Sequence, residues 1–261
     1  MSLAWHILHF LIRIAMGISF SIGVTSPREV TSGFFRIHLW VVMGIGVLAA
    51  LVAWSLGSSD SLAIPRSVST GAALLAVTSY LGASCWIYEA RRIGRLLTFL
   101  ATLLAGLLVV TTAAGPNHVL SLEDWPRIIG GISAGLLVGT TTTAMLLGHW
   151  YLNAPGMKLQ PLRRLLVLVL VAIALRTLVC GGGLVELLLT DGAQPARWWI
   201  FVSFRWLAGI AGTVLLTAMA WMTLRIPNTQ SATGILYAAT VLAMLGELAS
   251  QLLSDTLPYH L

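Results

Sequence analysis

The sequence predicts an all-α membrane protein, and its composition and its long apolar runs carry that prediction. Hydrophobic residues make up 57% of the 261 residues, charged residues make up 9%, and the mean hydropathy is +0.90. Soluble domains carry about 25% charged residues, and an aqueous fold of this length lacks the interior to bury so much apolar surface. A lipid bilayer is therefore the expected solvent.

Eight apolar runs are long enough to cross a bilayer, which takes about 20 mostly apolar residues per helix. Short breaks rich in Pro, Gly, Ser or Asn separate the runs, and none of these breaks has the length of a soluble domain. We therefore expect one integral membrane domain over residues 1–261, built as a bundle of eight transmembrane helices. The expected spans are 3–24, 34–57, 69–89, 95–114, 127–152, 163–189, 198–224 and 233–253.

The distribution of Lys and Arg predicts the orientation of the chain, because cytoplasmic loops carry an excess of these residues. The loops after the first, third, fifth and seventh spans, with their flanks, carry Arg28, Arg36, Arg91, Arg92, Arg95, Lys158, Arg163, Arg164 and Arg225. The opposite side carries Arg66, Arg127 and Arg197. Both termini should face away from the cytoplasm, in the cell inner membrane. The net charge of +6 is an orientation signal on this interpretation, and no nucleic acid partner is expected.

Two segments of the chain resemble each other. Residues 13–24 read RIAMGISFSIGV and residues 127–138 read RIIGGISAGLLV, with a fainter third copy in 205–211. A true repeat predicts two parallel four-helix halves, 1–115 and 125–261, because an even number of spans per half keeps the orientation the same. Convergence on close helix packing explains the likeness equally well, since small residues four apart let membrane helices approach.

Four charged side chains stand well inside the predicted spans: Arg13, Arg176, Arg205 and Glu247. Ionisable groups in hydrocarbon are costly and mark functional sites by default. Glu247 needs a cation or a proton, and Arg176 and Arg205 are its natural partners. The four residues form either a buried charge network that fixes helix register, or a site where Glu247 binds a quinol or relays its protons.

Two histidines lie near the predicted cytoplasmic ends of their spans, His38 in the second and His149 in the fifth. A neutral imidazole can hydrogen-bond a quinone carbonyl or accept a quinol proton. Trp150 and Tyr151 follow His149, and the next residues supply prolines and cations that suit a pocket rim. The candidate quinone-binding set is therefore His149, His38, Trp150, Tyr151 and Glu247. An interfacial aromatic belt accounts for the same residues without a ligand.

Haem b is the second choice of cofactor. A haem needs two axial ligands from facing helices, and His38 with His149 is the pair at matched depth. His6 and His9 lie at the opposite side of the predicted bundle, three residues apart on one helix, where a second ligand would have to come from the loop residue His118. The sequence contains no phosphate-binding loop, no HExxH and no clustered Cys. We expect no metal site and no catalytic residue in this chain acting alone.

A threonine run in the fifth span and a glycine run in the sixth span each allow two interpretations. Thr140–Thr143 form a polar run that either bends the helix through bonds to its own carbonyls or lines a path for a proton or substrate. Gly181–Gly183 weaken the sixth span in mid-membrane and form either a hinge or a place where a ligand approaches the backbone. Neither feature identifies a substrate.

The eight spans, the outward-facing termini and the possible duplication resemble the NrfD-like family, the membrane anchors of polysulfide and dimethyl sulfoxide reductases. The resemblance covers the overall layout and rests on no residue motif. It implies a quinol-binding subunit, using menaquinone or ubiquinone, that passes electrons to iron–sulfur or cytochrome partner subunits. Two other hypotheses stay open: a small transporter with a charged midplane site, and an accessory subunit that stabilises a larger membrane complex.

Overall fold

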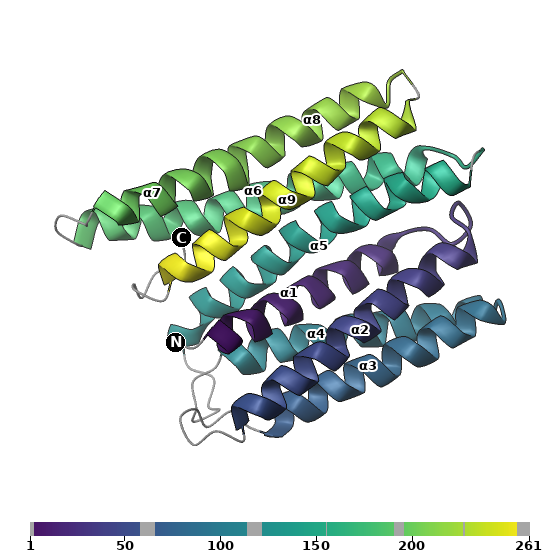
Figure 1. Cartoon of the computed structure of the whole chain (residues 1–261), viewed down its shortest axis with the longest axis horizontal. Helices are drawn as coiled ribbons and strands as arrows, with labels where there is room; N and C mark the ends of the chain where they lie inside the picture. The colour runs from purple at the N-terminus through teal and green to yellow at the C-terminus, as the bar shows by residue number, and fades with distance from the viewer. Residues whose placement is uncertain are drawn as a thin grey trace. The chain divides into compact units, whose positions relative to one another are not determined.

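The structure, a computed structural model, describes residues 3–57, 66–113, 122–154, 156–190, 196–226 and 228–254. The described residues form helices and the loops between them, and eight of these helices are long and apolar enough to cross a membrane. Helices are the expected outcome in lipid, where each backbone N–H and C=O must be paired within its own segment. The prediction of an all-α polytopic helical bundle is confirmed, and Figure 1 shows the long helices.

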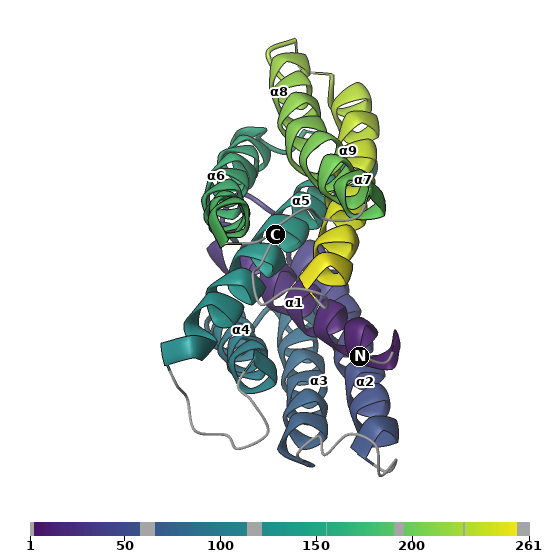
Figure 2. The same cartoon turned by 90° about the vertical axis from the view of Figure 1, so that its left-hand side faces the viewer.

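The chain divides into two compact units, Met1–Gly139 and Thr140–Leu261. In unit 1, α2 packs against α3, α3 against α4, and α1 against both α4 and α2, so that the four helices close a ring. Figure 2 shows the helices of this ring foreshortened. The elements of unit 1 are α1 (Leu3–Val24), α2 (Ser32–Gly57), α3 (Arg66–Ile87), α4 (Arg91–Ala113), the short 3-10 helix η1 (Leu122–Asp124) and the first part of α5 (Trp125–Asn153).

Unit 2 holds the rest of α5 and three further spans. Its other elements are α6 (Gln160–Thr190), α7 (Ala196–Phe204), the π-helix η2 (Arg205–Gly212), α8 (Thr213–Thr223) and α9 (Thr229–Ser254). The segments α7, η2 and α8 follow one another without a break and make a single span, and α9 packs against all three. Asn228 begins α9 as its N-cap, with its side-chain oxygen 3.0 Å from the backbone N–H of Ser231.

The predicted spans agree with the helices, and the differences lie at the ends. The third, fourth, sixth and eighth spanning helices begin three or four residues before their predicted starts, at Arg66, Arg91, Gln160 and Thr229. These polar residues extend a helix into the interfacial region, where water and headgroups accept charge, so hydropathy alone places the helix start too late. The loop between α5 and α6 turns at Gly156, whose φ is 93°. Glycine adopts this positive φ without steric strain because it has no Cβ.

Glycines allow the backbones of α1 and α5 to come into contact in unit 1. A Cβ on Gly17 of α1 would lie 1.8 Å from the backbone oxygen of Gly135 and 2.8 Å from the Cα of Gly139, both on α5. Side chains larger than hydrogen are therefore excluded at this crossing. Small residues four apart produce such contacts in membrane helices. The resemblance between 13–24 and 127–138 thus includes residues that pack against each other, while its origin by duplication stays a prediction.

Candidate functional site

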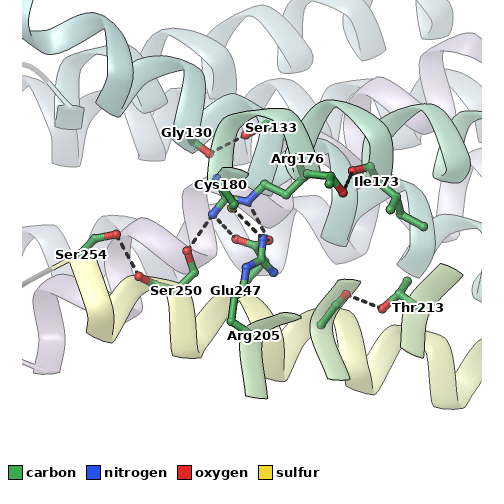
Figure 3. A network of polar contacts seen from close by, with 12 residues as sticks. Gly130, Ser133, Ile173, Arg176, Cys180, Arg205, Thr213, Glu247, Ser250 and Ser254 are labelled. Carbon is green, nitrogen blue, oxygen red and sulfur yellow. Dashed lines mark hydrogen bonds and ion pairs between the residues drawn. The ribbon is translucent and has the colours of Figure 1, made fainter. Parts of the chain in front are cut away.

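Two buried ion pairs in unit 2 join Arg176, Arg205 and Glu247 in one ion cluster (Figure 3). Arg176 donates from Nε to Glu247 Oε1 at 2.9 Å and from Nη2 to Oε2 at 2.8 Å. Arg205 places Nη2 2.7 Å from Glu247 Oε1. The side chains are 2%, 0% and 1% exposed, respectively. The pairing that the sequence predicted for Glu247 is therefore present, as one carboxylate between two guanidinium groups.

Local sequence explains why these groups meet. Gly246, directly before Glu247, packs on Gly209 of η2: a Cβ on Gly246 would lie 2.4 Å from the Cα of Gly209. Arg205 precedes Gly209 by four residues, so both lie on one face of the helix. The glycine contact brings the backbones of η2 and α9 together and aims Arg205 at the carboxylate. Arg205 Nη1 lies over this contact, 3.1 Å from a Cβ on either glycine.

Two further side chains complete the cluster, and sequence reasoning did not single them out for it. Ser250 Oγ lies 2.9 Å from Arg176 Nη2, and Cys180 Sγ lies 3.3 Å from Arg205 Nη2. Both residues are buried. Helical spacing was the available signal, because Ser250 follows Glu247 by three residues and Cys180 follows Arg176 by four. Cys180 is a free, buried cysteine that contacts Arg205.

The backbone of the cluster is also unusual. Residues Arg205–Gly212 form a π-helix, flanked by α-helix on both sides. Such segments are rare and occur frequently at functional sites. Thr213, the next residue, donates from its hydroxyl to the carbonyl of Gly209 at 2.7 Å. The widened turn therefore begins at the arginine that contacts the carboxylate.

The second polar site of unit 2 pairs His149 of α5 with Tyr237 of α9. The Tyr237 hydroxyl lies 3.4 Å from His149 Nδ1, and both side chains are exposed on the surface of the chain. A Cβ on the neighbouring Gly148 would lie 2.8 Å from the Oγ1 of Thr233, so α5 and α9 approach closely here. Tyr237 was not among the predicted residues, and nothing in its local sequence separates it from an ordinary interfacial tyrosine.

The other predicted residues near His149 have separate roles. Tyr151 is buried, and its hydroxyl donates to the carbonyl of Lys158, which ties the end of α5 to the following loop. Trp150 is half-buried next to His149. Glu247 lies ten residues along α9 from Tyr237, or about 15 Å at 1.5 Å per residue. The structure therefore does not bring Glu247 and His149 into one site.

His38 and Arg13 belong to unit 1. His38 is buried, its Nδ1 contacts the carbonyl oxygen of Phe34 one turn earlier, and its ring centroid is 4.1 Å from that of Phe34. Arg13 is half-buried, with its guanidinium beside Gly131. A joint site of His38 with His149, and a place for Arg13 in the network of Arg176, Arg205 and Glu247, remain predictions.

The polar run Thr140–Thr143 is buried in α5. Thr240 of α9 donates to the carbonyl of Thr141 at 3.4 Å. Other threonines in unit 2, such as Thr217 and Thr233, bond to carbonyls one turn back. Both interpretations of the run therefore stay open. Among the described residues, no group of three or more His, Cys, Asp or Glu side chains is placed to hold a metal ion. His118 lies outside the described residues.

The fold and the two polar sites define a multi-pass helical membrane protein with a buried arginine–glutamate–arginine cluster. Comparison of the chain with protein-family models, curated proteins and solved structures found no match.

Proposed function

We propose that this protein is the quinone-binding membrane subunit of an electron-transport complex, and that the quinone headgroup binds at His149 and Tyr237. The observation that carries the proposal is the exposed pair of polar rings on two spanning helices, α5 and α9. Polar side chains on a lipid-accessible helical surface need partners, because hydrocarbon supplies none. A quinone reaches its site from the lipid and offers two carbonyl acceptors.

The chemistry of the pair suits a quinone. When the Tyr237 hydroxyl donates to Nδ1 of a neutral His149, Nε2 carries the ring proton and can donate to a quinone carbonyl. The same imidazole can accept a proton from a quinol. His149 lies four residues before the end of α5, or about 6 Å along the helix, at a depth that headgroups occupy. Trp150 beside it supplies a ring for stacking.

The proposal extends to orientation and partners. The cations at this end of unit 2, including Lys158 and Arg163, support a location on the cytoplasmic side, because cytoplasmic loops carry an excess of Lys and Arg. Both termini then face the other side of the inner membrane. This layout agrees with an NrfD-like anchor that docks an iron–sulfur or cytochrome subunit. The quinone is menaquinone or ubiquinone, and haem b is the alternative group.

The ion cluster supports a second candidate function, a small transporter. Arg176, Arg205 and Glu247 are fully buried and come from three different spans. Charged groups gathered inside a helical bundle are the usual form of a midplane substrate site. A transporter needs no redox partner, which separates the two functions experimentally.

Purification of the intact protein in a mild detergent tests the proposal. A visible spectrum before and after dithionite reports haem and iron–sulfur partners, and solvent extraction reports bound quinone. We expect bound quinone and co-purifying redox subunits. A colourless, quinone-free protein recovered alone would contradict the proposal and favour the transporter.

Substitution of His149 then localises the site. Quenching of tryptophan fluorescence by a short-chain ubiquinone should show saturable binding to the wild type. His149→Ala should weaken it about tenfold, the effect of one lost hydrogen bond of about 1.4 kcal/mol. Tyr237→Phe should weaken it less, because the imidazole remains. The control is His6→Ala, a histidine of unit 1 near the start of α1. Equal quenching in His149→Ala and wild type would exclude this site.

A further inference from the structure

The ion cluster contains more positive than negative charge. Two guanidinium groups, Arg176 and Arg205, contact one carboxylate, Glu247, and all three are fully buried. Glu186 is the other acid that the structure describes in unit 2; it is exposed and lies ten residues from Arg176 on α6. At about 1.5 Å per residue that is about 15 Å away. Within the described part of unit 2, the cluster therefore carries a net charge of +1 in a membrane-spanning segment, where uncompensated charge is costly.

Arg205 has fewer partners in the cluster than Arg176. Arg176 engages both oxygens of Glu247 and also Ser250. Arg205 uses only Nη2, which contacts Glu247 and the weak acceptor Cys180 Sγ. Nε and Nη1 of Arg205 are buried and meet no hydrogen-bond acceptor among the described residues. A buried unpaired donor is costly, and each instance in a protein calls for a physical explanation.

Other side chains of unit 2 also carry buried donors that meet no acceptor among the described residues. The indole N–H groups of Trp198 and Trp206 are buried and, within the described chain, have no acceptor. Trp206 packs with Trp198 against the apolar cluster of Leu187, Val202 and Leu253. Gln251, one helical turn after Glu247, has a buried amide whose nitrogen and oxygen are also unpaired among the described residues. Arg205, Trp198 and Trp206 therefore carry buried N–H donors without acceptors among the described residues, and Gln251 carries both a donor and an acceptor. A ligand that pairs with these donors must bring acceptor atoms.

The backbone holds Arg205 in this position. Its Nη1 rests on the contact between Gly209 and Gly246, and the π-helix begins at Arg205 itself. The guanidinium therefore cannot turn away without breaking its ion pair to Glu247. A fixed, desolvated guanidinium with free N–H groups is the usual construction of an anion site.

We propose that the cluster binds one small monovalent anion beside Arg205, with Nε as its main donor and the Gln251 amide or a nearby indole N–H as a second. One negative charge matches the net charge of +1. The bound group is a halide ion or a single carboxylate. This site lies about 15 Å along α9 from Tyr237, so the inference does not depend on quinone binding.

Equilibrium binding of radioactive chloride to the detergent-purified protein, in a sulfate buffer that contains no monovalent carboxylate, tests the proposal. We expect one saturable site per chain in the wild type. Arg205→Gln removes the excess charge while Arg176 still pairs with Glu247, and it should reduce chloride binding more than tenfold. Arg225→Gln is the matched control, an exposed arginine of unit 2 beyond the end of α8, and it should bind like the wild type. Unchanged binding in Arg205→Gln would overturn the proposal.

Competition separates the two sources of the anion. Displacement of chloride by millimolar bromide but not by acetate indicates a halide site. Displacement by acetate, or saturable binding of radioactive acetate where chloride does not bind, indicates a carboxylate site. The absence of saturable binding of either probe would overturn the proposal. Gln251→Leu provides a second variant that keeps all charges, and it should weaken binding severalfold. His149→Ala should leave anion binding unchanged, which keeps this test separate from that of the quinone site.

Discussion

The two units contain the same short sequence pattern, an arginine followed four residues later by a glycine, and use it differently. In unit 1, Arg13 and Gly17 of α1 pack on α5, and a Cβ on Gly135 would lie 2.6 Å from the backbone oxygen of Arg13. In unit 2, Arg205 and Gly209 pack on α9 with Gly246. Both patterns produce a close approach of helix backbones. Arg13 is half-buried, whereas Arg205 is fully buried.

The difference lies on the opposing helix. Residues 125–153, which form α5, include neither Asp nor Glu, while α9 carries Glu247 directly after its contact glycine. The glycine contacts bring helix backbones together in both units, and in unit 2 the opposing helix also supplies a carboxylate that pairs with Arg205. In unit 2 the pattern therefore belongs to a buried ion cluster.

The largest expected effect comes from removing that carboxylate. Glu247→Gln leaves two buried guanidinium groups without their counterion, and it should lower the free energy of unfolding by about 3–5 kcal/mol. The free energy of unfolding can be measured by titrating a denaturing detergent into the protein purified in a mild detergent. The triple variant Arg176→Met, Arg205→Met, Glu247→Leu removes every charge and should be clearly more stable than Glu247→Gln. If the triple variant is the less stable of the two, the cluster is not dominated by charge pairing.

The next effect tests the glycine contact of unit 1. Gly17→Ala places a Cβ 1.8 Å from a backbone oxygen that cannot move alone, so α1 and α5 must separate, at a cost of about 3 kcal/mol. Gly44→Ala on α2 is the control, since its Cβ would meet nothing within 4 Å. It should be neutral or stabilising by up to about 1 kcal/mol. Thermal unfolding of both variants in one detergent gives the comparison, and equal behaviour would disprove the close contact.

The smallest effect sharpens the comparison between the units. Gly246→Ala should cost about 2 kcal/mol, because its Cβ meets the Cα of Gly209 and displaces Arg205 Nη1. The displacement also strains the ion pair, so Gly246→Ala and Glu247→Gln should be non-additive by about 1 kcal/mol. A double-mutant cycle on unfolding free energies measures that coupling. Strict additivity would mean that the glycine contact and the ion pair act independently.

Most of the fold was predictable because hydropathy and length constrain a membrane helix strongly. The first span, Leu3–Val24, agrees with its prediction at both ends. Starts at polar residues such as Arg66 and Gln160 were placed too late, because hydropathy does not report how far a helix extends into the interface. The π-helix at Arg205–Gly212 had no sequence signal beyond its glycines. The division of the chain within α5, between Gly139 and Thr140, was not anticipated either.

The site was predictable where charge alone decides. An acid in a membrane helix requires a cation, so the partners of Glu247 followed from the short list of buried arginines. The depth and rotation of each helix decide the rest, and a single sequence does not give them. For that reason Glu247 and His149 were placed in one candidate set although ten residues of α9 separate Glu247 from Tyr237. Tyr237 and Ser250 were missed because their contacts come from neighbouring helices.

Glu247 lies in the last helix, so the ribosome synthesises it after both of its arginine partners. Glu247 follows Arg176 by 71 residues, and it follows Arg205 by 42. At about 5–20 residues per second, the ribosome adds Glu247 about 4–14 s after Arg176 and about 2–8 s after Arg205. During that interval the growing chain holds two membrane-embedded cations whose carboxylate does not yet exist. Insertion of α9 supplies one negative charge for the two cations, so a chain that stops short of α9 keeps both of them in the bilayer without this partner.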